Sequence, residues 1–422
     1  MRYHGPTMQR LKGFREFYPE PLPPGEAWSC DLRQHVFDCW RRTARRYAFR
    51  EYDGPPLEPL ALYTAKSGDE IVGQLFNFND KGDEAVAMRP EMTPTVARMV
   101  ASVERAYKKP VKWFSMPQLF RYEAPQKGRL REHFQLNCDI FGEADAAADA
   151  EVVALLVDVL RSLGLTSEDF VVRLSSRKAW QGFFESNGGR EGQSYEFFQA
   201  VDKIERDDEA TLARRLEPTG VSLEAVRRFI AAGEPTAELQ GVLNNLHARG
   251  MGDFAKIDYG VIRGLAYYTG IVFEAFDRKG EFRAIAGGGR YDNLIRSLSG
   301  GRADMPAIGF GMGDVVLALL LRERGRVPSF ASSVDVVVLV EDESLRPESL
   351  AIVQRLRDRG LAVDYSLVPM KGDKQFRRAI EQGAGHTVRV ERDAGGVVAR
   401  VKELKTRAER VMSVEEAGAG GW

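Results

Sequence analysis

Cysteine is scarce in this chain: its 422 residues include only Cys30, Cys39 and Cys138. Three thiols are too few for a disulfide scaffold, and no pair has the Cys-x-x-Cys spacing that is typical of structural zinc sites. This usage excludes a small disulfide-stabilised secreted domain and favours a reducing, cytoplasmic environment.

Long apolar runs and an excess of one charge are also absent. No apolar run reaches the roughly 18 residues that a membrane helix requires, and the N-terminal segment has no apolar core of signal-peptide length. We therefore predict a water-soluble protein without a membrane partner. The formal net charge is -1, so global charge does not indicate a polyanionic ligand, and local clusters must be considered instead.

The length and a hydrophobic content of 44% allow two or three domains with large cores. We predict that residues 1–328 form one domain of short strands and helices, with a helical insertion at about 185–255, where Gly and Pro interrupt a charged sequence. Residues 334–414 alternate strand and helix patterns, which favours a separate α/β domain with parallel pairing. The low-complexity tail after residue 414 is expected to be frayed.

A basic cluster lies in the sequence FRYEAPQKGRLREHFQLNCDIFG, residues 120–142, on a predicted loop between two strands. Its members are Arg121, Lys127, Arg129 and Arg131. Guanidinium groups bind phosphate oxygens through planar donor pairs, so the cluster suits a polyphosphate. The alternative is a solvated charged hairpin, although Arg121 lies within the predicted strand 111–121.

The returning strand, predicted at residues 135–141, carries Gln135 and Asp139. These residues are four apart and therefore face the same side of the strand. Either both polar side chains lie on the same face of a half-buried sheet, where they could line a binding site, or that face is exposed to solvent. Periodicity does not distinguish these two interpretations.

The segment VIRGLAYYTGIVFEAF, residues 261–276, places Arg263 between an apolar strand and Gly264. Tyr267 and Tyr268 follow on a turn, where paired tyrosines can close over a flat ligand and donate hydroxyls to it. The alternative is that one tyrosine belongs to the core and the other to the surface.

Two further segments could approach a ligand. In AIAGGGRYDNLI, residues 284–295, three glycines end a strand predicted at 282–286 and allow close backbone approach, although their spacing matches no P-loop. In RPEMTP, Glu91 could receive an ammonium group. Thr93 has a simpler interpretation as the cap of the following helix.

Taken in this order, the segments resemble the class II histidyl-tRNA synthetases. RYEAPQKGR resembles the second class motif, and RGLAYYTG and GGGRYD resemble two histidine-specific motifs. The resemblance implies an α+β fold: an antiparallel-sheet catalytic core with a helical insertion, followed by a C-terminal α/β anticodon-binding domain. It also implies a homodimer, with residues 51–59 at its interface, and the ligands L-histidine, ATP with Mg²⁺, and tRNA(His).

Matching motif by motif, the resemblance assigns catalytic roles to Arg121 and Arg263, at the α-phosphate and the reacting carboxylate. The residues matched to histidine binding are Glu91, Thr93, Gln135, Asp139, Tyr267 and Tyr268. The residues matched to ATP binding are Arg121, Glu123, Arg129, His133, Gly309 and Gly311. The motifs do not assign direct ligands to the metal.

The implied chemistry explains which residue types are needed. A carboxylate oxygen of histidine attacks the α-phosphate of ATP, giving histidyl-adenylate and pyrophosphate, and the histidyl group then passes to the terminal ribose of tRNA. Preorganised arginines and Mg²⁺ would stabilise the negative charge that accumulates at phosphorus. Activation needs little proton transfer, so no Ser-His-Asp or Cys-His set is required.

The sequence departs from the family pattern in three ways: Ala266 replaces a common Asp, Asp314–Val315 replaces a Glu-Arg pair, and His133 replaces an aromatic residue that stacks on adenine. Two alternatives follow, namely a regulatory subunit of ATP phosphoribosyltransferase and a non-catalytic tRNA-binding sensor. The synthetase is favoured by Arg263 and by the C-terminal segment 346–410, which holds 15 basic and 9 acidic residues.

Overall fold

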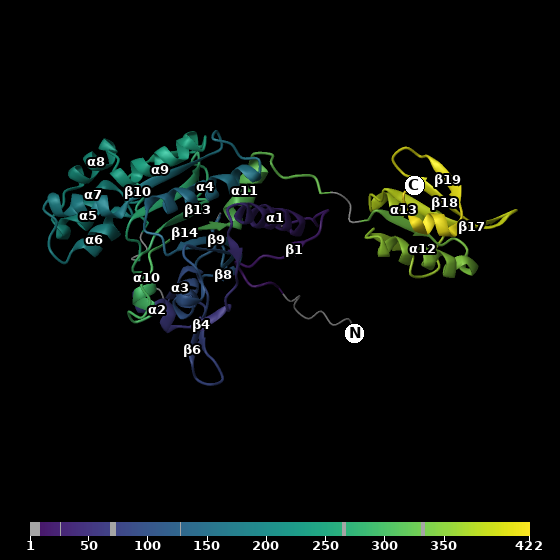
Figure 1. The fold of residues 1–422 in the computed structure, drawn as a ribbon, viewed down its shortest axis with the longest axis horizontal. Coiled ribbons are helices and arrows are strands. Elements are labelled where there is room, and N and C mark those ends of the chain that lie inside the picture. The colour runs from purple at the N-terminus through teal and green to yellow at the C-terminus, as the bar shows by residue number, and fades with distance from the viewer. Residues whose placement is uncertain (1–8, 26, 68–72, 127, 264–266, 331–333) are drawn as a thin grey trace, which may run out of the picture. The chain divides into compact units, whose positions relative to one another are not determined.

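The structure is a computed structural model in which two compact units, residues 1–328 and 329–422, are described separately (Figure 1). The described residues are 9–25, 27–67, 73–126, 128–263, 267–330 and 334–422. Lys127, Gly264 and Ala266, which the sequence singled out, lie outside these ranges. None of the helices in the described ranges has the length and apolarity that crossing a bilayer requires.

The N-terminal unit is built on a nine-stranded sheet with the order β11-β10-β12-β13-β14-β9-β7-β3, to which β8 adds by pairing with β9. The strands are β3 (Arg50–Glu51), β7 (Val111–Ser115), β8 (Gln118–Phe120), β9 (Glu132–Phe141), β10 (Phe170–Ser176), β11 (Ala255–Ile257), β12 (Ile271–Asp277), β13 (Ala286–Arg290) and β14 (Ala307–Gly313). All neighbours from β10 to β7 are antiparallel, and the outermost pairs β10–β11 and β3–β7 are parallel. The predicted antiparallel core is confirmed.

Strand β9 separates an apolar face from a polar one. Leu136, Cys138 and Ile140 are almost fully buried, whereas the alternate positions carry Gln135 and Asp139. Helix α4 (Ala146–Ser162) begins at the Asp145 cap and packs on the sheet at β9 and β14. The other helices around this sheet are α1 (Cys30–Arg46), α3 (Thr93–Ser102), α10 (Leu294–Leu298) and α11 (Asp314–Glu323).

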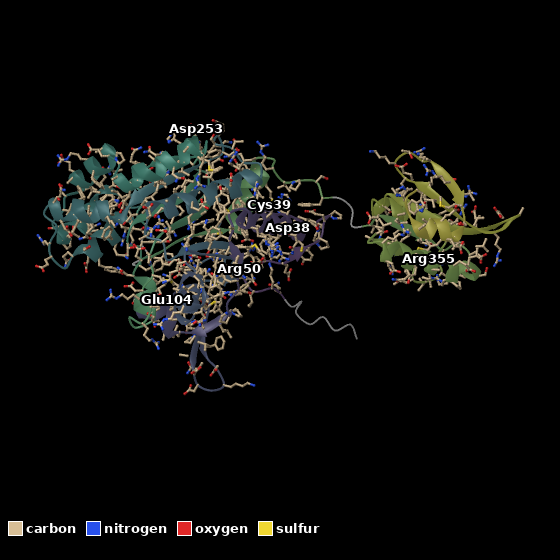
Figure 2. All side chains as sticks on the ribbon, viewed as in Figure 1. Asp38, Cys39, Arg50, Glu104, Asp253 and Arg355 are labelled. Atoms are coloured by element: carbon tan, nitrogen blue, oxygen red, sulfur yellow. The ribbon has the colours of Figure 1, made fainter. Side chains whose placement is uncertain are left out.

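Smaller elements complete the unit. They are the pair β1 (Phe17–Tyr18) and β2 (Trp28–Ser29), the sheet of β4 (Leu57–Pro59), β5 (Asn77–Asn79) and β6 (Ala85–Met88), and helix α2 (Ala61–Ser67). All three cysteines are free, and Figure 2 shows Cys39 on α1.

Two strand predictions are wrong. The predicted strand 111–121 is divided into β7 and β8 around Pro117, whose missing N–H cannot join a ladder, so Arg121 follows a strand instead of lying within one. The predicted strand 282–286 is largely a turn, because the Asp277 carboxylate accepts hydrogen bonds from two backbone amides of that turn. The three glycines lie within β13 and do not end a strand.

The segment around residues 185–255 is mainly helical. Its elements are α5 (Arg177–Ser186), α6 (Ser194–Val201), α7 (Glu209–Leu216), α8 (Leu223–Ala232) and α9 (Ala237–Ala248). Trp180 packs against Phe197 and Phe229, and its indole N–H donates to the carbonyl of Tyr259 at 3.2 Å. This aromatic core holds the helices next to the segment that leads to Arg263.

The C-terminal unit is a five-stranded mixed sheet with the order β16-β15-β17-β18-β19, parallel at first and antiparallel beyond β17. Its elements are β15 (Val336–Leu339), α12 (Arg346–Asp358), β16 (Val363–Tyr365), α13 (Gly372–Glu381), β17 (His386–Asp393), β18 (Gly396–Glu403), β19 (Glu409–Met412) and α14 (Val414–Ala419). The expectation of a frayed tail is wrong, because Ser413 and Glu416 form a capping box, Ala417 is buried, and the Trp422 indole donates to the Ala417 carbonyl.

Candidate functional site

A cleft of about 780 Å³ opens over β13, β14 and the start of β9. Both arginines to which the sequence assigns catalytic roles, Arg121 and Arg263, line it. Gln135, Gly287 and Gly311 contribute to its floor. Two segments that are 142 residues apart in the sequence therefore converge on one space, as the predicted site requires.

The two arginines are held in different ways. The Arg121 Nε donates to the backbone carbonyl of Pro90 at 3.0 Å, and the Arg263 Nη1 donates to the Glu274 carboxylate at 3.1 Å. Arg263 has a φ of 55°, in the left-handed region that a side-chain-bearing residue rarely adopts. Its Nε is buried and has no hydrogen-bond partner among the described residues, which leaves one donor for a ligand.

Glycine in β13 is required by the position of Arg263. A Cβ atom on Gly287 would overlap the Arg263 Nη1, so any side chain there would displace the guanidinium. The same relation occurs on β14, where a Cβ on Gly309 would overlap the Asp139 Oδ1, and one on Gly311 would lie 2.7 Å from the Gln135 amide carbon. The glycines make room for polar side chains that cross the sheet from neighbouring segments.

Asp139 lies in the sheet and is only 3% exposed, so the exposed-face interpretation is wrong for this residue. The Tyr291 hydroxyl donates to its Oδ1. Burial raises the pKa of Asp139 to about 7, and the hydrogen bond from Tyr291 acts in the opposite direction. A buried carboxylate with one protein donor has accepting capacity left for a ligand.

The paired tyrosines lie beside Glu91. The Tyr267 hydroxyl donates to the Glu91 Oε2 at 2.9 Å, and the Tyr268 ring lies 5.5 Å from the Arg263 guanidinium carbon. Tyr267 is half-buried and Tyr268 is buried, so neither belongs to the exposed surface. Burial raises the pKa of Glu91, while Arg121, Tyr267 and Arg263 act to lower it.

Thr93 does not cap the following helix. Met92 occupies the N-cap position without a side-chain hydrogen bond, and Thr93 is the first residue of α3. The cap interpretation is therefore wrong. Thr93 follows Glu91 by two residues and is in the first turn of α3.

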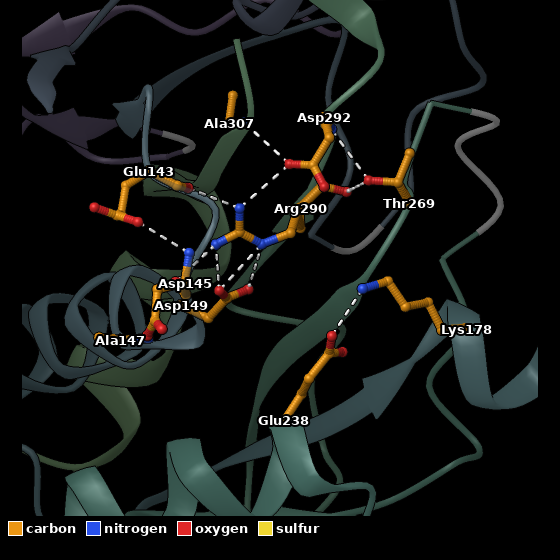
Figure 3. Close-up of polar contacts among 10 residues, drawn as sticks. All are labelled: Glu143, Asp145, Ala147, Asp149, Lys178, Glu238, Thr269, Arg290, Asp292 and Ala307. Carbon is orange, nitrogen blue, oxygen red and sulfur yellow. Dashed lines mark hydrogen bonds and ion pairs between the residues drawn. The ribbon is translucent and has the colours of Figure 1, made fainter. Parts of the chain in front are cut away.

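The GGGRYD segment fixes the end of β13 to the rest of the unit (Figure 3). The Arg290 guanidinium pairs with Asp149 on α4 and donates to the backbone carbonyl of Glu143 at 2.9 Å. Asp292 accepts from the Ala307 amide at 3.2 Å, and its own amide donates to the Thr269 hydroxyl at 3.1 Å. These contacts hold the turn on which Tyr291 reaches Asp139.

The loop after Arg121 contributes Glu123 and Arg129 to the cleft, and these two residues form an ion pair. Arg131 is not among the residues that line the cleft; its Nε donates to the Glu123 carbonyl and its guanidinium stacks on Tyr122. The solvated-hairpin interpretation is thus wrong for Arg121, which is half-buried and bonded to the Pro90 carbonyl, whereas the Arg129 side chain remains 42% exposed.

His133 lines the cleft next to Gly311 and Gly313. Burial lowers its pKa to about 3, and the positive charges of Arg121 and Arg15 act in the same direction, so the ring is neutral at ordinary pH. Gly309 is not among the lining residues, because Asp139 covers it.

The Asp314 departure has a structural explanation. Arg15, in the N-terminal segment, pairs with Glu132 at 2.6 Å and with Asp314 at 2.8 Å, and all three side chains are buried. Asp314 also accepts a hydrogen bond from the Phe134 amide at 3.0 Å. The next residue, Val315, lines the cleft. Asp314 therefore supports the wall of the cleft, while Val315 presents an apolar surface to it.

Several residues of the site were not identified from the sequence. They are Arg15, Arg206, Glu274, Arg283 and Tyr291. Tyr291 could have been found as part of the GGGRYD motif, whereas the others belong to no motif. No group of three or more His, Cys, Asp or Glu side chains in the described ranges could hold a metal ion.

Comparisons with known proteins follow this geometry. A family model described as Histidyl-tRNA synthetase matches residues 20–313, and one described as Anticodon binding domain matches residues 333–419. The chain is 44% identical to the histidine–tRNA ligase of Opitutus terrae, over 98% of each chain. It is 36% identical to the chloroplastic/mitochondrial histidine–tRNA ligase of Arabidopsis thaliana, over 90% of this chain and 79% of that protein.

Solved structures share the fold. A histidyl-tRNA synthetase from Nostoc superposes with a TM-score of 0.74 at 24% identity, over 92% of this chain and 94% of that one. A Bacillus halodurans protein described as an ATP phosphoribosyltransferase regulatory subunit/histidyl-tRNA synthetase superposes with a TM-score of 0.71 at 21% identity, over 91% and 98%.

Proposed function

Because the chain belongs to the histidyl-tRNA synthetase family, we propose that it activates L-histidine with ATP and transfers the histidyl group to the 3′ end of tRNA(His). The observation that carries this proposal is the convergence of Arg121 and Arg263 on one cleft. Glu91 follows Pro90, whose carbonyl accepts from Arg121, and Asp139 lies on β9 with Gln135, which lines the cleft. Two preorganised guanidinium groups that line one cleft suit a reaction that accumulates negative charge on phosphorus.

Histidine would bind at the end of the cleft nearest Glu91 and Asp139, which we call the inner end. Asp139, fixed by Tyr291, can accept an imidazole N–H, and Tyr268 can meet the other ring edge. Glu91, fixed by Tyr267, can receive the α-ammonium group together with Thr93 and Gln135. Each carboxylate is already oriented by a tyrosine, so little ordering is left to occur when histidine binds.

ATP would bind with its α-phosphate between Arg121 and Arg263, near Glu123, Arg129 and His133. Mg²⁺ needs only one or two carboxylates in addition to phosphate oxygens, and Glu123 and Glu274 line the cleft, so the residues present fit the ion. When bound, Mg²⁺ neutralises part of the phosphate charge. The carboxylate of histidine can then approach the α-phosphate while the arginines orient both groups.

The remaining assignments rest on the family. The C-terminal unit would bind the anticodon of tRNA(His), and its matched domain description and excess of basic residues support this. A homodimer with residues 51–59 at the interface, and a cytoplasmic location, complete the proposal.

Histidine-dependent exchange between ATP and pyrophosphate tests the proposal directly. We expect the purified protein to catalyse exchange with histidine and not with other amino acids, and to charge tRNA(His). Absence of exchange, together with co-purification of an ATP phosphoribosyltransferase, would instead indicate the regulatory subunit. Binding of tRNA without exchange or such a partner would indicate a sensor.

A further inference from the structure

Five arginines line the cleft, and they differ in how their charge is balanced. Arg129 pairs with Glu123, and Arg263 pairs with Glu274. Within the described ranges, no carboxylate lies at ion-pair distance from the other three, which are Arg121, Arg206 and Arg283. The lining holds five arginines against the four carboxylates of Glu123, Asp202, Glu205 and Glu274, and guanidinium groups that are not held in ion pairs can bind an anion with more than one charge.

The order of these groups along the cleft follows from their neighbours. Arg121 donates to the carbonyl of Pro90, which precedes Glu91, and Arg263 lies over the ring of Tyr268, next to the tyrosine that donates to Glu91. Arg129 has a pKa that is lowered by burial and then by the charges of Arg283, Arg121 and Arg206. Arg121 therefore lies beside the Glu91 end of the cleft, whereas Arg129, Arg206 and Arg283, which form the outer end, line the same cleft from other segments.

The outer end is assembled from three separate segments. Arg283 lies on the turn between β12 and β13, and its Nη2 donates to the Gln126 Oε1 at 2.6 Å, which joins this turn to the loop that carries Arg129. Arg206 comes from the helical insertion, next to Asp202 and Glu205 in the lining of the cleft. Both arginines are exposed, so a ligand can reach them from solvent.

We propose that Arg283 and Arg206 bind the β- and γ-phosphates of ATP, the part that leaves as pyrophosphate. The identification of the nucleotide rests on the proposed function. An α-phosphate at Arg121 and Arg263 directs the rest of the triphosphate either outward or toward Glu91. The negative charge of Glu91 disfavours the direction toward Glu91, and the arginines that are not held in ion pairs favour the outward direction.

Comparing ATP with AMP isolates the proposed contact, because AMP lacks the two outer phosphates. We expect Arg283→Ala to weaken equilibrium binding of Mg-ATP by about tenfold, as for the loss of a charge-assisted hydrogen bond, and binding of AMP by less than about twofold. Arg206→Ala should behave similarly, and Arg283→Lys should recover part of the loss. In exchange assays the KM for ATP and for pyrophosphate should rise while the KM for histidine stays unchanged.

Two basic residues outside the cleft provide matched controls. Lys279 lies on the same turn as Arg283 and is 60% exposed, and Arg228 lies in the helical insertion and is 72% exposed. Lys279→Ala and Arg228→Ala should leave the affinities for ATP and AMP unchanged. Equal losses for ATP and AMP in Arg283→Ala, or losses no larger than in the controls, would overturn the proposal.

The same variants separate a contact with ATP from a contact with tRNA. If Arg283 and Arg206 contact a phosphate of tRNA instead, their replacement would raise the KM for tRNA(His) in aminoacylation and leave ATP binding intact, which contradicts the proposal. If the wild-type protein binds ATP more tightly than AMP through Arg283 but shows no histidine-dependent exchange, the proposed function fails and the phosphate assignment stands.

Discussion

The inner and outer ends of the cleft are built on opposite principles. At the inner end both carboxylates have a protein partner: Tyr291 donates to Asp139, and Tyr267 donates to Glu91. At the outer end, Arg206 and Arg283 are exposed and have no carboxylate at ion-pair distance in the described part of the chain. The side chains of the inner end are oriented before any ligand arrives, and the outer end presents guanidinium groups that are not held in ion pairs.

This difference suits two kinds of ligand. An amino acid must be distinguished from close analogues, which requires buried donors and acceptors at fixed positions. A triphosphate tail needs only opposite charge, and its product must leave after the reaction. Exposed guanidinium groups can attract such a group and release it into solvent, because each contact is partly screened by water.

The largest effect should come from replacing Arg263, which lies where the two ends of the cleft meet. Arg263→Ala should lower kcat/KM for histidine-dependent exchange by about 100- to 1000-fold, as for the loss of one electrostatic donor in an active site. Arg263→Lys should recover little, because an ammonium group lacks the planar pair of donors. Steady-state exchange kinetics measure both, with unfolding by urea to verify that the variants are folded. A loss below about tenfold would place the chemistry elsewhere.

Asp139→Asn tests the inner end. It should raise the KM for histidine by about 10- to 100-fold, the range for a hydrogen bond to a charged group, and leave the KM for ATP within about twofold. Tyr291→Phe should act in the same direction more weakly, because it removes only the group that orients the carboxylate. If either variant changes the KM for ATP as much as the KM for histidine, the two ends are not independent.

The pKa of Asp139 predicts a pH effect on stability. The folded value of about 7 lies above the ordinary value, so between about pH 4 and 7 the folded protein holds a proton that the unfolded chain has released. The contribution of this group to stability therefore falls as pH rises through that window. Without histidine, Asp139→Asn should be more stable than the wild type at pH 8, by at least about 1 kcal/mol, with the difference shrinking toward pH 4.

Urea unfolding at several pH values measures this effect. Asp208 is an exposed helix cap whose pKa is lowered by hydrogen bonds from its own turn. It provides a control, because its contribution to stability is lost as pH falls and not as pH rises. A constant difference between Asp139→Asn and the wild type across the pH range would show that the carboxyl group is not titrating in its buried position.

The smallest effect should be the response to salt. Raising the ionic strength should increase the KM for ATP several-fold and the KM for histidine by less than about twofold, because exposed charges are screened more than buried ones. The double replacement of Arg206 and Arg283 by alanine should reduce this dependence for ATP. Equal salt dependence for both substrates would remove the distinction between the ends.

Sequence alone predicted the parts of the fold that are encoded locally. The apolar stripe of residues 147–163 predicts a helix, and α4 spans Ala146–Ser162, because its stripe and acidic cap are contained in its own segment. Strand β13 was misplaced, since glycines give no side-chain pattern. This strand is defined by its two neighbours, β12 and β14, which hydrogen-bond to it on both sides.

The same distinction applies to the candidate site. Arg121 and Arg263 could be found because they belong to ordered motifs, and the structure places both in one cleft. Arg206 and Arg283 could not, because nothing in their local sequence separates them from the other basic residues of a chain that has 60. Only the tertiary fold brings the insertion and the β12–β13 turn to the cleft.

The buried ion pairs of Arg15 have a consequence for biosynthesis. Its two partners follow it by 117 and 299 residues, so the N-terminal segment leaves the ribosome long before Asp314 has been made. Until then Arg15 can pair with Glu132 but not with Asp314, so its full set of ion pairs forms only after residue 314 has been made.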